Sequence, residues 1–225
     1  MQQYSPKTSV KGVIFDFDGV IVDTLSLHLQ AWERAYSSIL GKPIGDYAKI
    51  IGHATEEVAR NLANESLKPE IAPSLVKLKR TEYYGVQQKV RLFPGVHEIF
   101  LLLKKGSIPF GIASNSRQAF ICSALSSHHI EVPIVVGIDN VKNPKPDPEP
   151  FILCARLMNI SPKDFRSILV FEDSFHGVQA ASKAGMTPIG ITSALSNSDL
   201  MKAGAKTTYS CLLEAVECHF LDSSF

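Results

Sequence analysis

The chain has 225 residues, of which 45% are hydrophobic and 20% charged, a composition typical of a globular protein with a substantial apolar core. Its 23 basic and 22 acidic residues give a net charge of +1, which offers no electrostatic reason to expect a nucleic-acid partner. No apolar run approaches the roughly 20 residues that cross a bilayer, and the N-terminus lacks the apolar segment of a signal peptide, so we expect a cytoplasmic protein with no membrane partner.

The first predicted element is a buried strand that ends on two acids. Val13, Ile14 and Phe15 form a continuous apolar run, which is typical of a parallel strand covered on both faces. Asp16 and Asp18 follow at once, and Gly19 indicates a turn. Because residues i and i+2 of a strand share a face, both carboxylates could point the same way at the strand's end. Two like charges this close need a cation or a proton between them.

The next stretch, residues 25–89, predicts an inserted helical domain. It shows no convincing strand, and apolar residues recur at helical spacing in LSLHLQAWERAYSSIL, TEEVARNLANE and PSLVKLKRTEYYGVQQ. We interpret the insert as a small α-helical cap domain, with residues 1–24 and 90–225 forming the core domain.

From residue 90 onward, short apolar runs alternate with helix-like stretches. The runs cover residues 108–114, 134–139, 167–173 and 187–192. Alternation of this kind is typical of an open parallel sheet with helices on both faces. The sequence therefore predicts an α/β fold, a Rossmann-like doubly wound parallel sheet that carries the helical cap.

Polar clusters follow several of the predicted strands, at the edge where such sheets bind ligands. Ser114 and Asn115 follow the second run, and we expect them to open a helix whose hydroxyl, amide and N–H groups face an anion. Lys145 adds a positive charge in a proline-rich loop, and Glu172 and Asp173 end a later run.

Together with the first pair, these residues place four acids at one edge of the sheet, namely Asp16, Asp18, Glu172 and Asp173. That density calls for a hard cation with oxygen ligands, and Mg²⁺ fits because it accepts few protein ligands and keeps water and phosphate oxygens. A metal, a lysine and a helix N-terminus converge on one ligand type, a phosphate.

The motifs together resemble those of the haloacid dehalogenase-like superfamily, in the subfamily with a helical cap after the first strand. They occur in the family's order: DFDGV at residues 16–20, the serine of IASNS (Ser114), the lysine of KPDPEPF (Lys145), and FEDS at residues 171–174 followed by GVQAASKAGM. The resemblance covers nearly the whole chain.

This resemblance implies a phosphatase. Asp16 would be the nucleophile that forms an aspartyl-phosphate, and Asp18 the general acid for the leaving oxygen and then the base for water. Family dehalogenases and phosphonatases lack an acid two residues after the nucleophile, so Asp18 argues against both of those chemistries.

The resemblance also implies how the cofactor and the phosphate are held. Mg²⁺ would be bound by Asp16, the main-chain carbonyl of Asp18 and Asp173, with Glu172 as a direct or an outer-shell ligand. The transferring phosphoryl oxygens would be held by Ser114 and Lys145, with assistance from Asn115.

Within the family, the chain resembles β-phosphoglucomutases and the sugar-phosphate phosphatases beside them. HLQAW matches the H-x-x-A-W stretch of the mutase cap and places His28 and Trp32 on one helix face. The mutase cap loop has an arginine three residues after a glycine, where this chain has Thr55. We therefore predict a phosphatase of small phosphorylated metabolites, with the mutase as the alternative if another basic residue compensates; the candidates are Arg60, Lys79 and Arg80.

Other interpretations stay open for several residues. Trp32 is equally compatible with a place in the apolar core of the cap, and we expect Lys79 and Arg80 to be solvated. The whole protein could also be a phosphate-binding module without turnover, against which the intact pair Asp16 and Asp18 argues. The sequence carries no signal for an oligomeric state.

Overall fold

The computed structural model describes residues 10–47, 50, 55–86 and 90–220, and the chain divides into two compact units. The sheet unit comprises the chain up to Val22 and from Arg91 onward, and the helical unit comprises Asp23–Val90. Among the described residues, no helix combines the length and apolar character that a membrane crossing requires.

The sheet unit is built on six strands in the order β5-β4-β1-β6-β7-β8, and the strand pairs are parallel. The central strand β1 pairs with β4 on one side and β6 on the other, so that Ile14 lies opposite Gly111 and Val170. The strands span Gly12–Phe15 (β1), Phe110–Ala113 (β4), Val135–Val136 (β5), Ile168–Glu172 (β6), Thr187–Ile191 (β7) and Thr208–Tyr209 (β8). The predicted α/β fold with a parallel sheet is confirmed.

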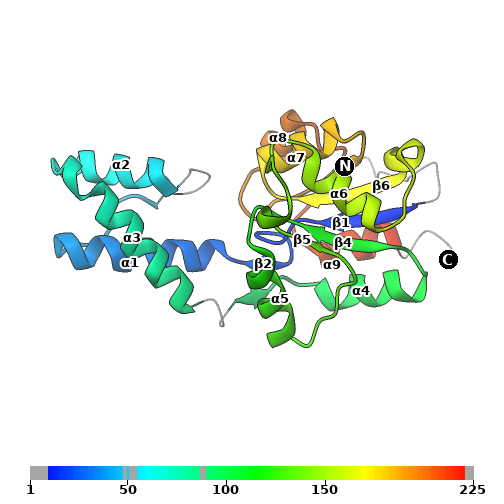
Figure 1. Ribbon diagram of the computed structural model, residues 1–225, viewed down its shortest axis with the longest axis horizontal. Coiled ribbons are helices and arrows are strands. Elements are labelled where there is room, and N and C mark those ends of the chain that lie inside the picture. Colours follow the sequence, from blue (N-terminus) through cyan, green and yellow to red (C-terminus); the bar gives the residue numbers. More distant parts are fainter. Residues whose placement is uncertain (1–9, 48–49, 51–54, 87–89, 221–225) are drawn as a thin grey trace. The chain divides into compact units, whose positions relative to one another are not determined.

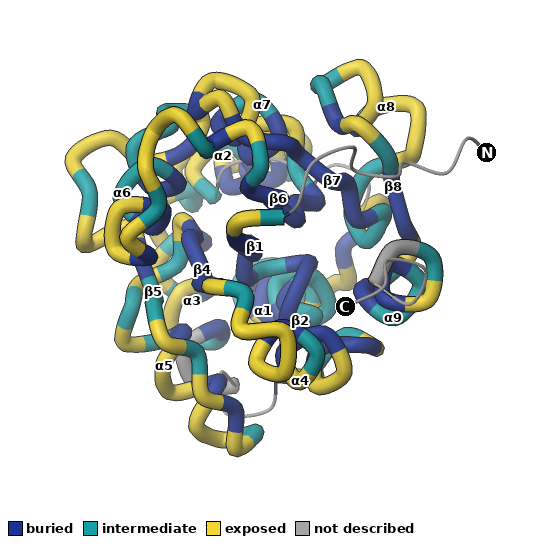
Figure 2. Tube along the Cα trace, turned by 90° about the vertical axis from the view of Figure 1, so that its right-hand side faces the viewer, coloured by how far each residue is buried: buried dark blue, intermediate teal, exposed yellow. Residues whose placement is uncertain are grey.

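Helices cover both faces of this sheet, with α6 and α7 on one face and α4 and α9 on the other (Figure 1). The helices span Val96–Lys105 (α4), Gln118–Ser127 (α5), Glu149–Leu157 (α6), Phe175–Lys183 (α7), Asn197–Ala203 (α8) and Leu212–Ala215 (α9). Shorter turns are Ile138–Asn140 (η4), Pro162–Ser167 (η5) and the π-helical Val216–Phe220 (η6). Figure 2 shows β6 and β7 buried along their length between these layers.

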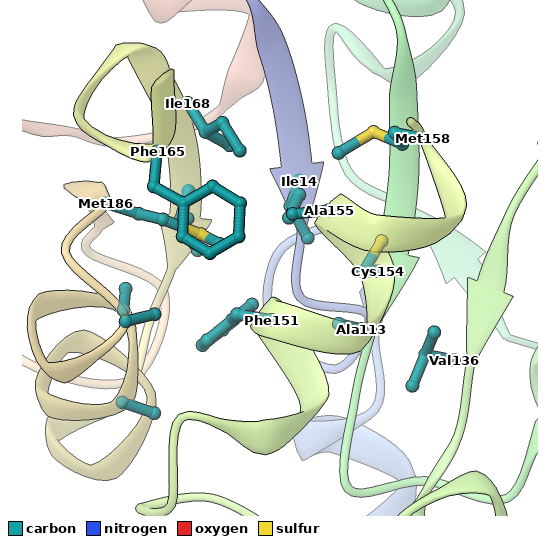
Figure 3. Packing of buried hydrophobic residues seen from close by; sticks show 14 residues of the cluster. Ile14, Ala113, Val136, Phe151, Cys154, Ala155, Met158, Phe165, Ile168 and Met186 are labelled. Atoms are coloured by element: carbon teal, nitrogen blue, oxygen red, sulfur yellow. The ribbon is translucent and has the colours of Figure 1, made fainter. Parts of the chain in front are cut away.

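The core of the sheet unit fixes the strand ends by packing both faces of β1. Ile14 points toward the α6 face, where Phe151 and Phe165 belong to the same buried cluster (Figure 3). Phe15 points to the opposite face, with its ring 5.2 Å from that of Phe100. A strand held on both faces leaves little freedom to the residues that follow it.

The helical unit packs three helices around its own apolar cluster. They are α1 (Leu25–Leu40), α2 (Thr55–Glu65) and α3 (Ala72–Val86), with a 3₁₀ turn at Pro69–Ile71 (η2). Gly41 ends α1 in the left-handed conformation at φ 68°, as glycine does at many helix ends. The buried cluster consists of Trp32, Tyr36, Ile44, Ile50, Val58, Ala59, Leu62, Ala63 and Leu75.

Two short strands pair where the chain leaves the sheet unit and where it returns. They are β2 (Val22–Asp23) and β3 (Arg91–Leu92), which form a separate two-stranded sheet. The sequence did not predict them, because two residues are too few to show a periodicity of two.

Candidate active site

The site lies at the carboxyl ends of three adjacent strands of the sheet unit. Asp16 follows β1, Ser114 follows β4, and Glu172 and Asp173 end and follow β6. Because β1 pairs with both of the other strands, these strand tips are neighbours. Lys145 joins them from the loop that precedes α6.

Lys145 connects two of these tips through a buried ion-pair network. Its Nζ lies 2.8 Å from Asp16 Oδ1 and 2.5 Å from Glu172 Oε1. All three residues are buried, and the ammonium group lies 4.6 Å from the centre of the Phe151 ring. Phe151, a member of the apolar cluster drawn in Figure 3, therefore connects this cluster with the charged site.

The carboxylates of the site outnumber the ammonium group of Lys145 that balances their charge. Burial raises the pKa of Asp16 against the attraction of Lys145, and burial together with the Asp16 charge raises the pKa of Glu172. The pKa of Asp173 is raised well above its usual range by burial, then by Asp16 and Glu172. Burial alone would lower the pKa of Lys145, but Asp16 and Glu172 raise it above its ordinary value. A buried cluster with this surplus of negative charge favours a cation.

The donor set fits a hard divalent cation. Asp16, Glu172 and Asp173 each offer a carboxylate oxygen, and these oxygens all lie within 4.8 Å of one another. Both carboxylate oxygens of Glu172 already accept hydrogen bonds from the protein. Its Oε1 accepts from Lys145, and its Oε2 accepts from the Ser174 N–H at 3.2 Å and from the Ser174 hydroxyl at 2.9 Å. Oxygen-only ligands from carboxylates are those that Mg²⁺ and Ca²⁺ take in proteins.

The Asp18 carboxylate is held by serine hydroxyls of the loop after β4. Ser116 Oγ donates to Asp18 Oδ2 at 2.6 Å, and Ser114 Oγ donates to the same oxygen at 3.2 Å. Asp18 Oδ1 is buried and has no hydrogen-bond partner among the described residues. Sequence reasoning missed Ser116; its signal was a second hydroxyl two residues after the motif serine.

The expectation that Ser114 and Asn115 open a helix is wrong. Helix α5 begins at Gln118, and the Gln118 N–H donates to Asp139 Oδ1 at 2.9 Å. The Asn115 side chain instead pairs with the backbone of Lys145: its amide donates to the Lys145 carbonyl at 3.2 Å and accepts from the Lys145 N–H at 3.0 Å. Asn115 thus holds the loop that carries the lysine.

Close backbone approach around the acids requires glycine at two positions. A Cβ at Gly19, whose φ is +78°, would overlap the Asp173 carboxylate, and a Cβ at Gly177 would overlap that of Glu172. Ser193, another residue that sequence reasoning missed, donates to Asp173 Oδ2 at 3.1 Å. The acids of β6 are therefore fixed by hydrogen bonds and by the backbone packed against them.

His28, a predicted substrate residue of the helical unit, contacts a buried cation, Lys79. Lys79 is only 4% exposed, so the expectation that it is solvated is wrong. Its Nζ lies 2.8 Å from His28 Nδ1 and 4.8 Å from the centre of the Tyr83 ring, on which His28 stacks. Burial and then the Lys79 charge lower the pKa of His28 to about 3, so the imidazole is neutral and accepts at Nδ1. Trp32 is buried in the apolar cluster.

The remaining candidates of the helical unit lie on its surface. Arg80 is exposed, as expected, and its guanidinium donates to Glu56 Oε1 at 2.6 Å. Thr55 is half-buried at the first position of α2, next to Glu56, and Arg60 is exposed. The Arg80 guanidinium is thus already paired with Glu56, which directly follows Thr55 in the chain.

Comparisons with known proteins agree on one family. Residues 13–191 match the family described as haloacid dehalogenase-like hydrolase. A phosphorylated carbohydrates phosphatase of Thermotoga maritima is 34% identical over 87% of this chain and 92% of its own length. The β-phosphoglucomutase of Bacillus subtilis is 28% identical over 81% and 83%. A solved haloacid dehalogenase-like protein of Agrobacterium tumefaciens is 26% identical, with a TM-score of 0.76 over 93% of this chain and 98% of that one.

Proposed function

This chain belongs to the haloacid dehalogenase-like hydrolase family, and we propose that it is a Mg²⁺-dependent phosphatase that hydrolyses small phosphomonoesters, chiefly sugar phosphates. The observation that carries the proposal is the buried carboxylate of Asp16, held by Lys145 at the tip of the central strand among three further acids. A carboxylate fixed in this way is suited to covalent catalysis through an aspartyl-phosphate.

The first half-reaction forms a phosphoenzyme. An Asp16 carboxylate oxygen attacks phosphorus, and the bond from phosphorus to the substrate's ester oxygen breaks. Asp18 donates a proton to that oxygen, which makes it a better leaving group. Lys145 keeps the nucleophile in place through Oδ1 and contributes positive charge beside the phosphoryl oxygens.

The second half-reaction restores the enzyme. Asp18, now ionised, takes a proton from water, whose oxygen attacks phosphorus and displaces Asp16. Ser114 and Lys145 bind the phosphoryl oxygens, while Asn115 acts through the Lys145 loop. The acid and the base are one residue, as a reaction with two successive displacements permits.

The cation would be held by Asp16, Asp173 and the main-chain carbonyl of Asp18. Glu172, with both oxygens bound by Lys145 and Ser174, would lie in the outer shell. The ion would offset the repulsion between an anionic nucleophile and an anionic substrate.

The substrate class follows from the relatives and from the helical unit. The Thermotoga relative named for phosphorylated carbohydrates covers most of this chain. We assign the helical unit the role of a substrate-selecting cap, with His28 of the H-x-x-A-W stretch as its candidate substrate residue. Trp32, buried in the apolar cluster of this unit, would support the helix that carries His28.

A mutase is the second candidate, favoured by the Bacillus relative of that name and by the H-x-x-A-W stretch beginning at His28. Phosphoryl transfer within a bound bisphosphate would need a further positively charged residue that binds the second phosphate. Thr55 has no charge. Of the basic residues that could compensate, Arg80 is paired with Glu56 and Lys79 is buried against His28, which leaves the exposed Arg60. We therefore favour hydrolysis.

The test is a panel of phosphorylated metabolites, assayed with and without Mg²⁺. It includes β-glucose 1-phosphate with a trace of the 1,6-bisphosphate. Release of inorganic phosphate that requires Mg²⁺ and disappears in Asp16→Asn supports the phosphatase. Formation of glucose 6-phosphate would establish the mutase, and a complete lack of turnover would indicate a phosphate-binding module.

A further inference from the structure

The loop after β4 presents two serine hydroxyls to one oxygen of Asp18, and the two are not equivalent. The Ser116 hydroxyl makes the shorter contact, 2.6 Å against 3.2 Å for Ser114. Ser114 Oγ also accepts a hydrogen bond from the Ser116 N–H at 3.0 Å. A hydroxyl has a single proton to donate, so in this arrangement the Ser114 proton is committed to Asp18.

We propose that Ser116 is a positioning residue that holds Asp18 Oδ2 throughout the reaction and so presents Oδ1 to the leaving oxygen. This inference rests on the phosphatase function proposed above. Ser114 donates its hydrogen bond to Asp18 only until phosphate binds. Its single O–H then donates to a phosphoryl oxygen instead. Ser116 then remains as the hydroxyl on the proton-transferring carboxylate.

The unpartnered oxygen of Asp18 supports this assignment. Oδ1 is buried and has no partner in the part of the chain that the structure describes, whereas Oδ2 is bound by both serines. In the first half-reaction, the proton leaves Oδ1 for the ester oxygen as the bond from that oxygen to phosphorus breaks. The negative charge that develops on Asp18 is stabilised at Oδ2 by the Ser116 hydroxyl. In the second, Oδ1 takes the proton of the attacking water.

The backbone of Ser116 is held independently of its hydroxyl. Its N–H donates to Ser114 Oγ, and its carbonyl accepts from the Ile138 N–H at 3.0 Å. Removing the hydroxyl should therefore leave the loop in place and remove only the hydrogen bond to Asp18. A hydrogen bond to an ionised group corresponds to about a 10- to 100-fold effect on rate.

The experiment compares substrates whose leaving groups differ in their need for a proton. Ser116→Ala is assayed with Mg²⁺ on glucose 6-phosphate, which has a poor leaving group, and on p-nitrophenyl phosphate, which has a good one. We read kcat/KM because it reports the steps up to leaving-group departure. We expect a loss of about 10- to 100-fold on the sugar phosphate and little change on the aryl ester.

Three further variants make the result specific to Ser116. Ser116→Thr keeps the hydroxyl and should restore activity on the sugar phosphate, whereas Ser116→Cys keeps the volume with a weaker donor and should behave like Ser116→Ala. Ser114→Ala should lose activity on both substrates, because it removes a phosphate contact.

Each remaining outcome has one meaning. Equal losses on both substrates, or no loss on either, in a folded Ser116→Ala or Ser116→Cys would overturn the positioning role. A wild-type protein that hydrolyses neither substrate nor any metabolite of the panel would instead overturn the phosphatase function, so the two failures are distinguishable.

Discussion

Both units of the molecule bury a lysine among their described residues, and they surround it differently. Lys145 of the sheet unit contacts two carboxylates, Asp16 and Glu172. Lys79 of the helical unit lies against the neutral imidazole of His28 and the ring of Tyr83. The contrast teaches that one buried charge is fixed by opposite charges in a geometry suited to chemistry. The other contacts two aromatic rings, and after burial its charge favours the neutral form of one of them, the His28 imidazole.

The largest expected loss of activity follows from replacing the nucleophile of the sheet unit. Asp16→Asn keeps the shape of the side chain and removes its nucleophilic charge, so we expect phosphatase activity to fall by about three orders of magnitude or more. Steady-state phosphate release measures this. The control is the same exchange at exposed Asp199 of the same unit, which should retain full activity. Substantial turnover by Asp16→Asn would remove Asp16 from the nucleophile's role.

Replacing each buried lysine with methionine compares the two environments directly. Lys145→Met leaves Asp16 and Glu172 buried without their partner, and breaking such a network costs about 3–5 kcal/mol of the free energy of unfolding. Lys79→Met removes the contacts of the ammonium group to His28 and to the Tyr83 ring, the loss of which we expect to cost about 1–2 kcal/mol. Urea denaturation in the presence of a chelator measures both losses. Equal losses would contradict the distinction drawn between the two lysines.

The helical unit should become less stable in acid through His28. Its pKa of about 3 lies below the ordinary value of 6.5, so the unfolded chain binds a proton that the folded one does not. The stabilisation is complete above pH 6.5 and is lost as the pH falls from 6.5 toward 3, by at most about 1.4 kcal/mol per pH unit. Urea midpoints between pH 7 and 4 should fall less in His28→Gln than in the wild type. The same exchange at exposed His97 is the control, and identical slopes for wild type and His28→Gln would refute the assignment.

The smallest effect belongs to the surface of the helical unit. Arg80 pairs with Glu56 where both side chains are exposed, and such pairs contribute about 0–1 kcal/mol. Arg80→Ala should therefore lower the unfolding free energy by less than about 1 kcal/mol and leave hydrolysis of p-nitrophenyl phosphate unchanged. A large loss of stability would contradict this expectation, because the pair would then contribute more to the unfolding free energy than an exposed ion pair does.

The sequence predicted the sheet and the acids at its edge because both depend on local signals. A continuous apolar run such as residues 13–15 indicates a buried strand, and polar residues directly after it must lie at the strand's end. The family resemblance, which the match over residues 13–191 confirms, then linked strand ends that are far apart in the chain.

The partners of individual side chains depend on tertiary packing, so the sequence predicted few of these contacts. Asn115 follows the motif serine in the chain, yet its amide is taken up by the Lys145 backbone, 30 residues away. Lys79 looked like a solvated residue because nothing in the local pattern shows that His28 and Tyr83 surround it. Ser116 was invisible for the same reason, since its significance lies in its distance to Asp18.

The most direct test of the account is to identify the phosphorylated residue during turnover. The protein is mixed with Mg²⁺ and substrate, quenched in acid and treated with borohydride, which reduces an aspartyl-phosphate to homoserine. Peptide mass spectrometry should then find homoserine at position 16 in the wild type and none in Asp16→Asn. Turnover accompanied by a phosphoryl group on another residue, or by no phosphoenzyme under conditions that trap one, would contradict the central claim.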